Sequence, residues 1–149
     1  MSILRTEDAQ KIREHLSERL TGDVTIDFYT QKSLLYVPGR ECPYCRETEQ
    51  MLEEIAALSD RIHLEVNDFY SDTERAAAKG VTHVPAFVLE GAGKGKVRYL
   101  GIPAGNEFSG LIEAVIDVST GTTALTDATR EGLKGLTRDV HVQVFVTPT

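Results

Sequence analysis

The stretch "GRECPYCRETEQMLEEI", residues 39–55, contains the only two cysteines of the 149-residue chain. Two residues separate Cys42 from Cys45, and the first of them is a proline. A run with helical periodicity follows at once, so the pair stands at the beginning of a predicted helix. Such a pair is typical of a redox couple, of half a zinc site, or of two buried thiols that lie close by chance.

The position of the pair favours redox chemistry. With Cys42 at the start of the helix, Pro43 falls in the first turn, where its missing N–H costs nothing. Cys42 and Cys45 then project from the same side of that turn, within disulfide reach. The free N–H groups of the helix end favour an anion, so we expect the pKa of the Cys42 thiol to lie below its usual value of about 8.5. Cys42 is therefore the predicted nucleophile and Cys45 the predicted resolving thiol.

Residues beside the pair are candidates for tuning this chemistry. Arg40 would stabilise a thiolate at Cys42 and Glu41 would destabilise it, because opposite and like charges shift a pKa in opposite directions. Tyr44 is either a packing residue or part of the surface that meets the substrate.

A structural zinc site needs two more ligands than the pair supplies. The chain has no third cysteine, and His63 and His83 are single histidines rather than a closely spaced pair. A small zinc-binding interaction module is therefore kept as an alternative that a measurement of metal content would test. Two inert buried cysteines are also disfavoured, since such thiols are rarely spaced around Pro-Tyr at a helix start.

The bulk composition argues against several classes of function. A formal net charge of −7 disfavours nucleic acid or an anionic membrane as a partner, because both attract basic surfaces. No apolar run approaches the length of a membrane span, and the start "MSILRTEDAQ" lacks the basic-then-apolar pattern of a signal peptide. We therefore expect a cytoplasmic protein, in which a disulfide is usually transient or catalytic.

Periodicity predicts alternating helices and strands along the chain. Helices are expected at 6–20, 43–59, 72–80 and 105–119, and strands at 24–30, 61–66, 85–90 and 96–101. Thr6 and Asp72 are the expected N-caps, and "GAGKG" is a hairpin loop between the last two strands. This order makes a mixed sheet with helices on both faces. A second apolar run, "LLYV" at 34–37, leaves open which run is the central strand before the cysteines, or whether the two form a hairpin.

The segment "THVPAFVL", residues 82–89, is the second candidate part of the site. Pro85 comes just before an apolar strand, where a cis-proline would leave the backbone N–H and C=O of Val84 free to pair with an extended substrate. The alternative is a trans proline that merely begins an edge strand. His83 lies two residues before Pro85 and is a candidate for proton transfer to Cys45.

These residues together resemble a known family. Cys42-Pro43-Tyr44-Cys45 at a helix start, with Val84-Pro85 before a hairpin, is similar to the layout of the thioredoxin fold, and Pro-Tyr is the dipeptide of glutaredoxins. Two other stretches are more specific: "VRYLGIPAGNEFSGLIEAVIDVS" at 97–119 and "VHVQVFVTPT" at 140–149. They look like the two-unit, glutaredoxin-like protein disulfide oxidoreductases of thermophilic archaea and bacteria, and this resemblance extends from about Val24 to the end.

The resemblance implies an α/β thioredoxin fold, with a mixed central sheet, helices on both faces and an extra N-terminal helix and strand. Residues 1–120 would form one such unit with its Cys-Pro-Tyr-Cys motif. Residues 121–149 would be a connector, a helix and the first strand of a truncated second unit. An alternating strand at 140–149 without its own sheet is an exposed edge, so we expect it to pair with the first unit's sheet or to drive self-association.

The activity that the resemblance implies is thiol:disulfide exchange with protein disulfides through Cys42 and Cys45. It also implies Val84 and Pro85 as the substrate-binding edge, no metal or organic cofactor, disulfide-containing protein substrates and a thioredoxin-reductase-like electron donor. The stretch 101–105, "GIPAG", stands where glutathione-dependent glutaredoxins have Gly-Gly and an acidic residue, so glutathione is not implied as the reductant. The alternatives are a non-catalytic docking half of a two-unit oxidoreductase and the thiol-relay domain of a flavin-dependent hydroperoxide reductase, although no nucleotide fingerprint is present.

Overall fold

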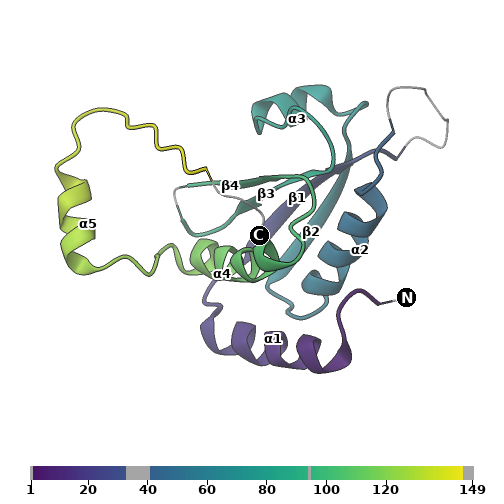
Figure 1. Ribbon diagram of the computed structural model, residues 1–149, viewed down its shortest axis with the longest axis horizontal. Helices are drawn as coiled ribbons and strands as arrows, with labels where there is room; N and C mark the ends of the chain where they lie inside the picture. The colour runs from purple at the N-terminus through teal and green to yellow at the C-terminus, as the bar shows by residue number, and fades with distance from the viewer. Residues whose placement is uncertain (1, 33–40, 94, 146–149) are drawn as a thin grey trace.

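The computed structural model of the protein describes residues 2–32, 41–93 and 95–145. At its centre lies a four-stranded sheet in the order β2-β1-β3-β4 (Figure 1). The strands are β1 (Val24–Thr30), β2 (Ile62–Asp68), β3 (Ala86–Glu90) and β4 (Val97–Leu100). β1 pairs in parallel with β2 and antiparallel with β3, which in turn pairs antiparallel with β4. The mixed sheet predicted from the element order is confirmed.

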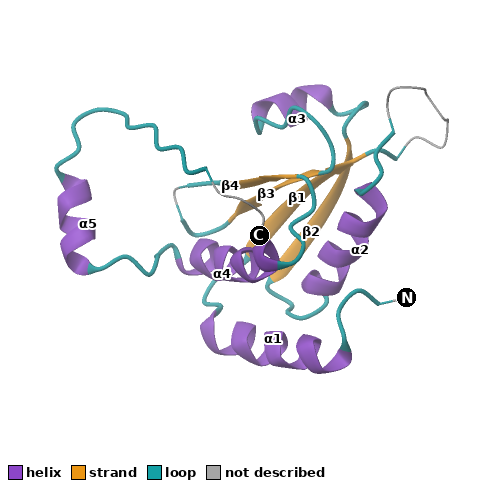
Figure 2. Cartoon of the chain, viewed as in Figure 1, coloured by secondary structure: helices purple, strands orange, loops and turns teal. Residues whose placement is uncertain are grey.

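Helices cover both faces of the sheet, as Figure 2 shows in purple. They are α1 (Thr6–Arg19), α2 (Cys45–Ala56), α3 (Thr73–Ala78) and α4 (Asn106–Thr120). A fifth helix, α5 (Asp127–Lys134), lies away from the sheet. The apolar side chains of α1, α2 and α4 join Ile26 and Phe28 of β1 in the main core. α3 lies on the other face, against Tyr29 and Val88. No helix in the described ranges is long and apolar enough to cross a membrane.

β1 is one of the two central strands, which answers a question that the sequence left open. The strand expected with the N-terminal helix ahead of the cysteines is itself part of the sheet, because Val24–Thr30 pairs along its full length with β2 and over five residues with β3. Pairing on both edges and packing on both faces explain why nearly all of its residues are buried. Only α1 precedes the sheet, and "LLYV" at 34–37 lies outside the described residues.

The beginnings of α1 and α3 differ in detail from the predicted N-caps. Thr6 is the first residue of α1 and not its cap; Arg5 occupies that position. Residues 2–4 donate hydrogen bonds to Glu54 of α2, and these bonds tie the segment before α1 to α2. Asp72 is the N-cap residue of α3, as expected, but its side chain accepts no cap hydrogen bond. Asp68 accepts hydrogen bonds from the turn before α3 instead.

The C-terminal segment, residues 121–145, is exposed throughout (Figure 1, green to yellow). The helix expected in this segment is α5, and none of its residues is buried. The strand predicted at 140–149 is not formed over 140–145, which pair with no strand of the described sheet; the remaining four residues lie outside the described part. An extended segment becomes a strand only through hydrogen bonds to a neighbouring strand, and none of the four described strands pairs with residues 140–145.

Candidate active site

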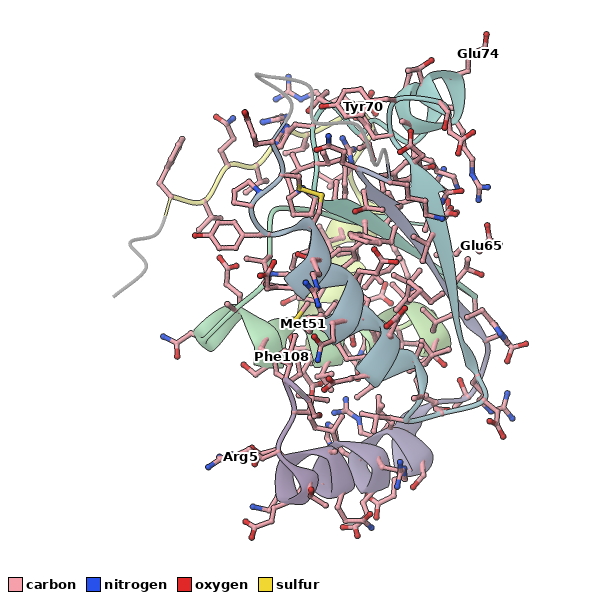
Figure 3. All side chains as sticks on the ribbon, turned by 90° about the vertical axis from the view of Figure 1, so that its right-hand side faces the viewer. Arg5, Met51, Glu65, Tyr70, Glu74 and Phe108 are labelled. Atoms are coloured by element: carbon pink, nitrogen blue, oxygen red, sulfur yellow. A yellow bond between two sulfur atoms is a disulfide. The ribbon has the colours of Figure 1, made fainter. Side chains whose placement is uncertain are left out.

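The two cysteines form a disulfide just before α2. The two Sγ atoms are 1.99 Å apart and the Cα atoms of Cys42 and Cys45 are 5.4 Å apart. Figure 3 draws this bond in yellow at the beginning of the helix. The helix begins at Cys45 and not at Cys42 or Pro43 as predicted, because residues 42–45 first form a turn in which the Cys45 N–H faces the Cys42 C=O at 3.4 Å. The disulfide thus joins the turn to the first helical residue.

The two cysteines differ in exposure. Cys45 is 6% exposed, whereas Cys42 is half-buried and the intervening Pro43 and Tyr44 are exposed. The turn is held against the helix by Thr48, whose N–H and hydroxyl both donate to the Tyr44 C=O, at 3.0 and 2.6 Å. Within the pair, Cys42 is therefore the residue that solvent reaches.

Val84 and Pro85 lie at the same end of the sheet as the disulfide. Ala86, the first residue of β3, is opposite Tyr29 near the end of β1, and α2 begins beside that end of β1 (Figure 1). The Val84–Pro85 peptide bond is cis, so the alternative of a trans proline is wrong. Pro85 is buried, and its C=O accepts a hydrogen bond from the N–H of Gly101 at 2.8 Å. Val84 is half-buried, and its backbone forms no hydrogen bond within the described part of the chain.

The other predicted residues are less closely tied to the disulfide. His83 is exposed, and its one hydrogen bond among the described residues joins its Nδ1 to the Thr82 hydroxyl at 3.0 Å. Its role in proton transfer to Cys45 therefore stays a prediction. Glu41 is exposed beside Cys42, and Arg40 lies outside the described residues.

The residues considered for a zinc site do not come together. Cys42 and Cys45 are bonded to each other, so neither is a free thiolate in this state. His63 is exposed, and its ring lies 3.9 Å from the carboxylate of Asp23. Within residues 2–32, 41–93 and 95–145, no three or more histidine, cysteine or carboxylate side chains gather in a way that could hold a metal ion.

A charged cluster beneath α3 was missed by the sequence interpretation. Asp27, in the middle of β1, is only 2% exposed, and its carboxylate lies 2.5 Å from Arg75 and 3.0 Å from Lys79. Tyr29 follows on the same side of β1, where burial and, secondly, the Asp27 charge raise its pKa. The signal in the sequence is the aspartate within the otherwise apolar "VTIDFYT", because a buried charge requires a charged partner.

Comparison with known sequences identifies the family. The thioredoxin-domain family matches residues 34–113, which is more than half of the chain. A probable thioredoxin from Methanothermobacter thermautotrophicus is 34% identical over 77 residues, which cover 51% of this chain and 82% of that protein. The chain belongs to the thioredoxin-domain family. With its bonded Cys42–Cys45 pair it is a thioredoxin-like oxidoreductase, as the cysteine motif predicted.

Two solved structures share the fold over most of this chain. A protein disulfide oxidoreductase from Aeropyrum pernix superimposes with a TM-score of 0.72 and 27% identity over 91% of this chain. An alkylhydroperoxide reductase from Enterococcus faecalis superimposes over 89% with a TM-score of 0.73, but its 22% identity shows a shared fold alone. This chain covers 57% and 61% of those two chains. The predicted resemblance to the protein disulfide oxidoreductases is confirmed.

Proposed function

We propose that this unit exchanges the disulfides of other proteins, with Cys42 as the nucleophile and Cys45 as the resolving thiol. The observation that carries the proposal is the difference in exposure between the two residues. A protein substrate is bulky and can reach the half-buried sulfur of Cys42, but it cannot reach the sulfur of Cys45 inside the first turn of α2. A thiol that waits in this protected position suits the second, intramolecular step.

In the reducing direction, the Cys42 thiolate attacks one sulfur of the substrate disulfide and bonds to it. The other substrate sulfur leaves as a thiolate and takes up a proton. Cys45 then loses its proton to solvent and attacks the Cys42 sulfur. The bond between Cys42 and the substrate breaks, and the substrate sulfur leaves as a thiolate that takes up a proton. Two electrons have passed from the dithiol to the substrate, and the product is the Cys42–Cys45 disulfide that the structure contains. The reverse steps oxidise a substrate dithiol.

We assign substrate binding to Val84 and Pro85. An extended segment of the substrate, next to its disulfide, would pair with the unbonded N–H and C=O of Val84 as a short added strand. Pro85 beneath it is held in place by the N–H of Gly101. Arg40 and Glu41, which flank Cys42 in the sequence, would tune the stability of its thiolate in opposite directions.

The proposed partners are disulfide-containing proteins and a thioredoxin-reductase-like electron donor, in the cytoplasm. We further propose that residues 121–149 begin a second thioredoxin-like unit. The Aeropyrum pernix match supports this, because it covers 91% of the chain and therefore includes part of the segment after residue 120. The exposed apolar side chains of the same segment support self-association as a further property.

Single-cysteine variants test the proposal with insulin as the protein disulfide. Cys45→Ser should form a stable mixed disulfide with insulin, seen as the summed mass and lost on addition of dithiothreitol. Cys42→Ser should form no such adduct, and insulin reduction should fall to the rate of the reductant alone. A glutathione-buffer titration of the wild-type pair should show one two-electron transition near the glutaredoxin range of about −200 to −230 mV. A pair that never titrates, with no insulin turnover, would favour the docking-half alternative.

A further inference from the structure

α3 is held on the sheet mainly by charged side chains, and Ala76 is its one residue in the apolar cluster beneath it. Arg75 Nη2 lies 2.5 Å from Asp27 Oδ1 in β1 and 2.5 Å from Glu65 Oε2 in β2. Lys79, directly after the helix, bonds to Glu90 in β3, and its Nζ lies 3.0 Å from Asp27 Oδ2. Just one residue of the six-residue helix is buried. Ion pairs therefore connect α3 to three of the four strands.

The remaining strand, β4, contacts the end of α3 through the side chain of Arg98. Its Nη1 donates a hydrogen bond of 2.6 Å to the C=O of Gly80. Gly80 has φ +70°, and a Cβ at this position would come within 2.6 Å of the same Nη1, so the guanidinium lies directly against the glycine. The N–H groups of Gly80 and Val81 donate to the C=O of Ala77 and Ala76, both at 2.9 Å, which closes the helix in a Schellman motif.

Residues 81–85 lead from this helix end to the proposed substrate edge. Val81 is 4% exposed and packs with Tyr29 in the small cluster beneath α3, and Val84 packs against the same cluster. At the other end of the segment, the C=O of Pro85 accepts a hydrogen bond from the N–H of Gly101, directly after β4. The segment that presents Val84 is therefore held at both ends. At the first end, the hydrogen bond from Arg98 to Gly80 adds to the Schellman hydrogen bonds and to the packing of Val81.

We propose that Arg98 is a positioning residue, which fixes the start of segment 80–85 and thereby the orientation in which Val84 offers its backbone to a protein substrate. This inference rests on the proposed function, in which Val84 pairs with the substrate. Arg98 is exposed, and its bond to Gly80 is its one polar contact among the described residues. Its removal leaves no buried charge without a partner, whereas removal of Arg75 would leave Asp27 with a missing partner.

Arg98 should act on substrate binding and not on the sulfur chemistry. It lies in the β3–β4 pair opposite Val88, and within the described residues its polar contact is with Gly80 at the end of α3 and not with either cysteine. Substrates that use the edge at Val84 should therefore bind less well when the segment loses this support. A small disulfide that meets only the sulfur of Cys42 should react at the wild-type rate.

The experiment compares Arg98→Ala and Arg98→Lys with wild type on two substrates, insulin and 5,5′-dithiobis(2-nitrobenzoate). We expect Arg98→Ala to lower kcat/KM for insulin by about tenfold, mainly through KM, because a bond from a charged donor is lost. The rate with the small disulfide should not change. Arg98→Lys keeps the charge but not the planar guanidinium, so insulin reduction should recover in part. Arg61→Ala is the matched control, since Arg61 is an exposed arginine that also reaches a backbone C=O, that of Thr21 at 3.5 Å.

Hydrogen exchange of the Gly80 and Val81 amides gives a readout that needs no activity, because both N–H groups are hydrogen-bonded at the end of α3. Exchange there should be faster in Arg98→Ala and unchanged in Arg61→Ala, while the unfolding temperature of both stays near that of wild type. Equal loss with both substrates, or unchanged exchange at these two amides, would overturn the positioning role. A wild-type protein that reacts with the small disulfide but not with insulin would overturn the proposed function, and the inference with it, whatever the exchange shows.

Discussion

Glu54 has a role that its sequence pattern does not predict. The pattern indicates that the acidic residues of α2 form a solvated face. Its carboxylate accepts hydrogen bonds from the N–H of Ile3 at 2.8 Å, the N–H of Leu4 at 2.7 Å and the hydroxyl of Ser2 at 2.9 Å. Burial alone would raise its pKa, but the bonds from Leu4 and Ile3 outweigh burial and hold the pKa at about 2. Glu54 therefore anchors the segment before α1 onto α2.

Replacing Glu54 with glutamine should lower the free energy of unfolding at neutral pH by about 1 kcal/mol, because a charged acceptor of backbone N–H groups is lost. The folded pKa of about 2 lies below the ordinary 4.5, so this stabilisation is complete above pH 4.5 and is lost as the pH falls toward 2. Urea unfolding at neutral pH and at about pH 2 should show the difference between wild type and variant shrinking in acid. Glu53→Gln, at an exposed neighbour, is the control, and an equal loss in both variants would contradict the anchor role.

At the scale of the element, α4 agrees best with its sequence pattern. Its predicted buried face lies in or against the main core and consists of Phe108, Leu111, Ile112, Val115 and Ile116. The helix ends where Gly121 adopts φ +68° and its N–H donates to the C=O of Asp117 at 2.9 Å. Both features depend on residues close in the chain, which is why the pattern describes this helix well.

Replacing the glycine within α4 and the glycine directly after it with alanine should change the stability of the protein in opposite directions. Gly110 is exposed in the helix, and a Cβ there would meet nothing within 4 Å, so Gly110→Ala should stabilise the protein by about 0.5–1 kcal/mol. Gly121 has a positive φ, so Gly121→Ala should destabilise it by about 1 kcal/mol. Thermal unfolding of the two variants measures both effects, and shifts of the same sign would show that the account of α4 is wrong.

The whole molecule consists of a packed unit and a C-terminal segment that the unit does not bury. α5 has no buried residue, and Val142, Val144 and Phe145 are 75%, 79% and 90% exposed. A helix of eight residues is too short to be stable without packing, and an unpaired alternating segment is an edge for another strand. The segment therefore needs a partner surface, and this need supports the proposed self-association.

Self-association should be visible as a rise in sedimentation coefficient with protein concentration. Val142→Lys should weaken the association by about tenfold, because a charge on the apolar side of the segment opposes edge pairing. Gln143→Lys places the same charge on the alternate side and serves as the control. A protein that stays monomeric at every concentration, or that responds equally to both variants, would rule out pairing through this segment.

Much of the fold and of the candidate site follows from local patterns in the sequence. Strand-favouring composition, alternation and a hairpin loop predicted all four strands of the sheet within two residues at each end. The Cys-x-x-Cys spacing predicted the disulfide, and Pro85 before an apolar strand raised the cis-proline that the structure contains. These features were readable because periodicity, turn residues and short spacings depend on neighbours in the chain.

The central place of β1 and the side chains that support the site depend instead on tertiary contacts. Residues 24–30 and "LLYV" at 34–37 look equally like strands, and the pairing of β1 with two distant strands identifies the first as central. The contact of Arg75 with Asp27 joins residues 48 positions apart, that of Ile3 with Glu54 joins residues 51 apart, and that of Arg98 with Gly80 joins residues 18 apart. A periodic pattern shows which side of an element is apolar, but the partner that meets that side is set by how the elements pack, and a sequence pattern carries no record of it.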